Sequence, residues 1–172
     1  MEASFLSPSL GFRRPFGSGE DYGEAVIYNN NVGRVLAIDY GVRRTGLAVT
    51  DPLQIIPGGL TTVETPQLLA YLKNYLSREE VERFVVGLPR QTNGRDSDNL
   101  PRVKAFVEQL QKTFPAVPVD MWDERYTSVL AQQTILQSGI GKMARRNKAL
   151  VDEVSATIIL QGWMERGLGN RD

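Results

Sequence analysis

The side chains that could do chemistry in this chain are carboxylates, because its 172 residues include no histidine and no cysteine. This composition excludes a Ser-His-Asp triad, an imidazole base, a cysteine nucleophile and zinc sites built from histidine or thiolate. It also excludes disulfides, so the reducing cytoplasm is the expected location. A hydrolase of this composition must work through acidic side chains, most simply by holding a hard divalent metal ion.

Acidic residues end two of the expected strands and lie near the start of the last expected helix. Asp39 ends the most hydrophobic strand, Asp123 and Glu124 end the last strand, and Asp152 lies one turn into the last helix. Strand ends are where α/β sheets place ligands, so we expect these carboxylates to meet at one sheet edge. Converging carboxylates repel one another unless a cation lies between them, which predicts a magnesium site.

Each acid also has an ordinary structural explanation. Asp39 could form a turn before Gly41, Glu124 could pair with Arg125, and Asp152 could interact with the helix dipole. The choice between the two acids that end the last strand stays open, since Asp123 and Glu124 must point to opposite faces of the sheet. The apolar residues on the Asp123 side predict that its face is core, which leaves Glu124 on the face of Trp122.

Basic residues gather near two of these acids. Arg43 and Arg44 lie in the tight turn after Asp39, where guanidinium groups match phosphate oxygens. The segment just before Asp152 carries four basic residues and no acid, which favours contact with a nucleic-acid backbone over a merely soluble loop: Lys142, Arg145, Arg146 and Lys148. Twenty basic and twenty acidic residues balance, so net charge decides nothing.

Periodicity and turn residues predict the elements that position these groups. Strands are expected at about 34–39, 45–50, 55–63 (with a bulge at its prolines and glycines), 83–88 and 117–122. Helices are expected at about 68–76, 101–114, from 127 or 128 to 138, and 148–166, with a capping box formed by Ser77 and Glu80. This order predicts an α/β fold with a mixed five-stranded sheet and helices on both faces.

The N-terminal residues differ in composition from the rest of the chain. Residues 1–32 are rich in Gly, Pro, Ser and Asn, and we expect a disordered extension, with an organelle transit peptide as the alternative. No apolar run approaches the roughly 18–20 residues of a membrane span.

Four segments in order resemble the YqgF/RuvX family, a bacterial branch of the Holliday-junction-resolvase-like proteins that is generally described as nucleases of precursor 16S ribosomal RNA. The segments are Leu36–Asp51 (LAIDYGVRRTGLAVTD), Val85–Pro89 (VVGLP), Asp123–Ser128 (DERYTS) and Val151–Ala156 (VDEVSA). The resemblance covers about residues 33–166 and leaves out the N-terminal extension.

The resemblance implies a ribonuclease H-like nuclease domain over residues 33–168 and Mg²⁺- or Mn²⁺-dependent hydrolysis of phosphodiesters in the cytoplasm. It implies Asp39, Glu124 and Asp152 as metal ligands and catalytic residues, and Arg125 beside Arg43 and Arg44 as a nucleic-acid contact. Precursor ribosomal RNA is the expected partner of a monomer or homodimer, with no membrane involved.

Three other functions share parts of the pattern. A resolvase of four-way DNA junctions would need a symmetric dimer. A non-catalytic RNA-binding module of the same fold would keep the carboxylates without turnover. Asp39, Gly41, Thr45 and Gly46 also resemble the first phosphate loop of sugar kinases and actin-like ATPases, but this chain is too short for their second lobe.

Overall fold

The computed structural model describes residues 33–89, 97–124 and 147–169, which form one mixed sheet between two helical layers. The strands are β1 (Arg34–Asp39), β2 (Arg44–Thr50), β3 (Pro57–Glu64), β4 (Val81–Leu88) and β5 (Val119–Asp123). The helices are the 3-10 turn η1 (Thr65–Gln67), α1 (Leu68–Leu76), α2 (Leu100–Thr113) and α5 (Lys148–Gly169).

The sheet has the order β3-β2-β1-β4-β5. β1 pairs antiparallel with β2, and β2 pairs antiparallel with β3, whereas β1, β4 and β5 run parallel. The parallel strands therefore end at the same edge, where Asp39 closes β1 and Glu124 follows β5. The predicted mixed five-stranded sheet is confirmed.

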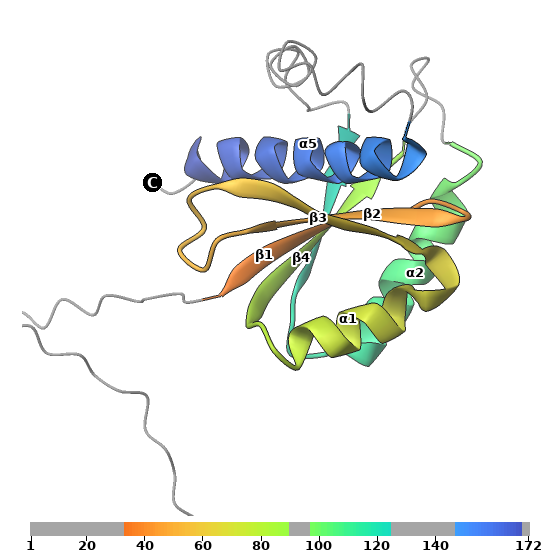
Figure 1. Cartoon of the computed structure of the whole chain (residues 1–172), viewed down its shortest axis with the longest axis horizontal. Helices are drawn as coiled ribbons and strands as arrows, with labels where there is room; N and C mark the ends of the chain where they lie inside the picture. The colour runs from red at the N-terminus through yellow and green to blue at the C-terminus, as the bar shows by residue number, and fades with distance from the viewer. Residues whose placement is uncertain (1–32, 90–96, 125–146, 170–172) are drawn as a thin grey trace, which may run out of the picture.

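The alternation of side chains along each strand builds two cores. Leu36 and Ile38 of β1 face α1 and α2 and join the larger cluster, while Val35 and Ala37 face α5 and join the smaller one. Figure 1 shows α5 along one face of the sheet and α1 and α2 on the other. Asp39 continues the Val35–Ala37 side, so its side chain belongs to the α5 face.

Glycines on the α5 face allow the helix to approach closely. A Cβ on Gly46 of β2 would overlap the backbone carbonyl of Asp152, and a Cβ on Gly59 of β3 would overlap the side chain of Glu153. Thr62 of β3 also donates from its hydroxyl to the carbonyl of Ala149. The first turns of α5 are therefore fixed on β2 through the backbone of Asp152 and on β3 through the side chains of Glu153 and Thr62.

The expected start of the third strand needs correction. The third strand begins at Pro57, because the Asp51 carboxylate accepts hydrogen bonds from the backbone N–H groups of Ile55 and Ile56 and holds them in a turn. The bulge expected in that strand is confirmed by the register shift opposite Leu47 and Ala48.

The predicted capping box is wrong. Ser77 follows the last residue of α1, and its hydroxyl donates back to the carbonyl of Asn74 instead of starting a new turn. The helix expected to end at residue 138 and the extension of residues 1–32 lie outside the described residues.

The expectation that one face of β5 is core was incomplete. Val119 packs against the α1–α2 core, but Met121 on the same face is 54% exposed, whereas Trp122 is buried against α5. The strand lies at the sheet edge, so the helices cover each of its faces only in part.

Candidate metal and phosphate site

Asp39 is the most perturbed acid among the described residues. Burial raises its pKa to about 7, and the negative charges of Glu124 and Asp152 contribute to that rise. A carboxyl group with this pKa is half-protonated near neutral pH, because desolvation and like charges both disfavour its ionised form. Two of the acids singled out from the sequence, Glu124 and Asp152, therefore act electrostatically on the third.

Glu124 reaches this site because the strand between it and Asp39 lacks a side chain there. Gly87 of β4 pairs with Trp122 of β5, and Glu124 Oε1 lies 3.3 Å from the position that a Cβ on Gly87 would take. Burial, followed by the charge of Asp123, raises the pKa of Glu124. Of the two acids at the end of β5, the structure thus places Glu124 on the side of Asp39.

Asp152 enters from one turn into α5, where its backbone lies on Gly46. Its carboxylate is already engaged, since Arg44 Nε donates to Asp152 Oδ2 over 3.0 Å. This ion pair joins the start of β2 to the start of α5, and it leaves Asp152 turned to a guanidinium.

The donor set fits a hard divalent cation. All three side chains offer oxygen atoms, and the mutual repulsion recorded in the raised pKa of Asp39 is what a cation would relieve. In the described part of the chain, no three acidic side chains are yet gathered closely enough to hold an ion. Binding would therefore require side-chain rearrangement, with Asp152 as the member that has another partner.

The turn after Asp39 is braced from two neighbouring elements. Asn99, just before α2, donates from its side-chain amide to the carbonyl of Tyr40, and the ring of Tyr40 stacks on Phe106 at 4.7 Å between centroids. Thr65 of η1 donates from its hydroxyl to the carbonyl of Gly41. No local sequence pattern marks these bracing residues, because each contact joins positions 24 or more residues apart.

The predicted basic contacts have different surroundings. Arg43 is exposed at the tip of the braced turn and Lys148 is exposed at the start of α5, so both are accessible to a phosphate. Arg44 is instead half-buried in its pair with Asp152. Arg125, Lys142, Arg145 and Arg146 lie outside the described residues.

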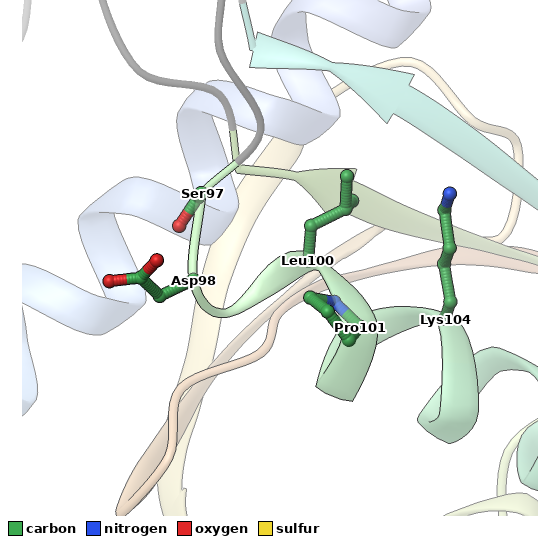
Figure 2. Close-up of a pocket in the computed structure, with 5 residues that line it drawn as sticks. All are labelled: Ser97, Asp98, Leu100, Pro101 and Lys104. Carbon is green, nitrogen blue, oxygen red and sulfur yellow. The ribbon is translucent and has the colours of Figure 1, made fainter.

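A shallow pocket opens at the start of α2, where Figure 2 shows its lining residues. They are Ser97, Asp98, Leu100, Pro101 and Lys104. None of the three acids of the candidate metal site lines this pocket, so it is distinct from that site. None of the helices described here is both long enough and apolar enough to cross a membrane.

Comparisons with known proteins agree with this architecture. The family model described as "RuvX: Holliday junction resolvase" matches residues 33–166. A Porphyromonas gingivalis protein named "Putative pre-16S rRNA nuclease" is 60% identical over 134 residues, which span 78% of this chain and 97% of the relative. A protein of the same name from Phocaeicola vulgatus is 56% identical over 134 residues, which span 78% of this chain and 96% of the relative.

Among solved structures, the RuvC structure from Thermus thermophilus matches with a TM-score of 0.51 at 17% sequence identity. The match covers 78% of this chain and 96% of that chain. At this identity the likeness concerns the fold alone, which is ribonuclease H-like, as the family resemblance implied.

Proposed function

Because this chain belongs to the RuvX family, we propose that it is a metal-dependent nuclease that hydrolyses phosphodiester bonds, with precursor 16S ribosomal RNA as its preferred substrate. The relatives that carry the name of such a nuclease support the substrate. The observation that carries the chemistry is the electrostatic convergence of Asp39, Glu124 and Asp152 at one sheet edge. Hydrolysis of ribosomal RNA would take place in the cytoplasm.

Asp39, Glu124 and Asp152 would hold Mg²⁺ or Mn²⁺, the cations suited to carboxylate oxygens. A bound ion of this kind supplies activation of water and stabilisation of charge on the phosphate and the leaving oxygen. The rigid turn after β1 keeps Asp39 in place, since Asn99 and Thr65 fix the carbonyl groups of the next two residues. Arg43 at its tip and Lys148 at the start of α5 would contact phosphates.

The Asp39→Asn change tests the activity. It removes a charge at nearly constant volume, so cleavage of precursor 16S ribosomal RNA in Mg²⁺ should fall to background while the circular dichroism spectrum is unchanged. Asp98→Asn, on an exposed acid before α2, is the control and should cleave like the wild type. Cleavage by Asp39→Asn at the wild-type rate would refute the metal site.

The description of the matching family model favours a second substrate, the four-way DNA junction. Incubation of the wild type with precursor RNA and with a synthetic junction, each with and without Mg²⁺ or Mn²⁺, distinguishes the two. Cleavage of the junction alone would replace the RNA proposal. Metal-dependent binding of RNA with no cleavage of either substrate would identify a non-catalytic binding module.

A further inference from the structure

One ion pair stands out because it uses a residue of the candidate metal site. The ion pairs of the described segments include Arg34–Glu79, Arg44–Asp152 and Arg83–Asp120. Glu79 and Asp120 lie outside the carboxylate group, but Asp152 is one of its three members. Arg44 therefore competes directly for an oxygen atom that a metal ion would need.

The negative charges of the three acids require a compensating positive charge both with and without a bound metal ion. Asp152 and Glu124 both act unfavourably on the ionised form of Asp39, so the folded chain places like charges together. Without a metal ion, the guanidinium of Arg44 is a positive group in contact with Asp152. Consistent with this, Asp39, Glu124 and Asp152 are not gathered into one ligand set.

We propose that Arg44 is an internal counter-ion that occupies Asp152 in the metal-free protein and releases it when a divalent metal ion binds. Arg44 thus competes with the ion for Asp152 and lowers the affinity of the site for the ion. This inference rests on the proposed metal-dependent nuclease function. It reassigns Arg44 from the standing phosphate contact expected from the sequence to a partner of the metal site.

If Arg44 instead helped Asp152 to bind the metal ion, its removal would change the metal affinity in the opposite direction. If Arg44 only oriented Asp152 so that the second carboxylate oxygen faced the ion, removing Arg44 would weaken metal binding. A counter-ion that must be displaced makes metal binding weaker than it would otherwise be. The direction of change in metal affinity therefore separates the two roles.

The first experiment measures Mg²⁺ binding by calorimetry in the absence of nucleic acid, for the wild type and for Arg44→Met. We expect the variant to bind Mg²⁺ about fivefold more tightly, because binding no longer has to break an ion pair between two unit charges about 4 Å apart in a water-exposed setting. Arg34→Met is the matched control, because it breaks an ion pair of the same 3.0 Å length between Arg34 and Glu79. Unchanged or weaker Mg²⁺ binding by Arg44→Met would overturn the inference.

A second experiment needs no variant that could misfold. The Nε–H resonance of Arg44 in ¹⁵N-labelled wild-type protein should shift when Mg²⁺ saturates the site, since its hydrogen bond to Asp152 is broken. The Nε–H resonance of Arg34, bonded to Glu79, should stay in place. An Arg44 resonance that does not move at saturating Mg²⁺ would refute displacement.

These outcomes separate the inference from the function on which it rests. Mg²⁺ binding by the wild type that Asp39→Asn abolishes, together with an unmoved Arg44 resonance, would reject the counter-ion and keep the nuclease site. Absence of Mg²⁺ binding by the wild type would reject both.

Discussion

At the scale of single residues, Asp39 lies where its ionised carboxyl group is energetically unfavourable. The residue ends a buried strand, and its carboxyl group has little access to solvent and two acidic neighbours. A buried ionised group of this kind costs free energy unless a cation compensates it. The raised pKa of Asp39 is therefore consistent with the proposed metal site, in which a bound cation would compensate the charge.

The raised pKa of Asp39 predicts how the metal-free protein responds to pH. Its pKa is about 7 in the folded state against an ordinary value of 3.8, so folding favours the protonated form. The stabilising contribution is complete below about pH 4 and is lost as pH rises toward 7. At pH 8, without metal, Asp39→Asn should therefore melt at a higher temperature than the wild type. The Tm should rise by about 2–4 °C for each kcal/mol by which the free energy of unfolding increases.

Thermal melts of both proteins in a chelator at pH 4.5, 6 and 8 provide the measurement. The difference in Tm between Asp39→Asn and wild type should grow with pH and level off above 7. A difference that is constant with pH would mean that Asp39 titrates as an ordinary exposed carboxyl group.

The two acids at the end of β5 give a second prediction at this scale. Glu124 acts on Asp39 across Gly87, whereas Asp123 pairs with Leu88 in the strand register and does not contribute to the raised pKa of Asp39. Glu124→Gln should reduce Mg²⁺ affinity by tenfold or more, which corresponds to about 1.4 kcal/mol of binding free energy. Asp123→Asn is the neighbouring control, and calorimetry provides the measurement. A larger loss of Mg²⁺ affinity in Asp123→Asn than in Glu124→Gln would identify Asp123 as the metal ligand in place of Glu124.

At the scale of elements, the position of α5 decides where Asp152 lies. The helix rests on glycines of β2 and β3, so its first turns can approach the sheet at backbone distance. This contact brings Asp152 beside Arg44 although 108 positions separate them in the chain. The glycines of β2 and β3 thus contribute to the site without supplying a ligand.

Substitution of Gly46 should disturb both stability and the site. A Cβ in Gly46→Ala would overlap the Asp152 carbonyl, which is backbone and cannot turn away, so α5 must shift. We expect the free energy of unfolding to fall by about 3 kcal/mol, the upper end for overpacking, together with weaker Mg²⁺ binding.

Gly58→Ala on β3 is the matched control, because a Cβ there meets nothing within 4 Å. Its free energy of unfolding in urea should stay within about 0.5 kcal/mol of the wild type. Equal stability of the two variants would show that the contact of α5 with β2 is looser than the structure indicates.

At the scale of the whole molecule, the two faces of the mixed sheet differ: one carries the larger hydrophobic core, and the other carries the candidate metal site. α1 and α2 cover one face with the larger core, while α5 covers the other face, toward which Asp39 is directed. Two exposed basic residues lie near these elements in the chain, Arg43 in the turn after β1 and Lys148 at the start of α5. Nucleic acid approaching the start of α5 would therefore meet the exposed Lys148.

This arrangement predicts which basic residues set the salt dependence of RNA binding. Replacing Lys142, Arg145, Arg146 and Lys148 by Gln should weaken binding and flatten the slope of log K against log salt by about 0.7 for each phosphate interaction removed. The control removes four exposed charges from α1 and α2: Lys73, Arg102, Lys104 and Lys112. Equal slopes for the two variants would exclude the segment as a phosphate contact.

The sequence by itself determined the class of chemistry and most of the elements. Without histidine or cysteine, the reactive groups had to be carboxylates, and side-chain periodicity predicted the strands and helices of the described segments to within a few residues. These properties are local, because they depend on residue types and on spacings within one element.

Tertiary structure alone decided how the site is assembled. The direction of Glu124 depends on which helix covers each face of β5, and the pairing of Arg44 with Asp152 depends on how closely α5 docks on Gly46. Such contacts join positions far apart in the chain, and packing rather than spacing sets them. For that reason the sequence could place three acids at one edge but could not show that an arginine already holds one of them.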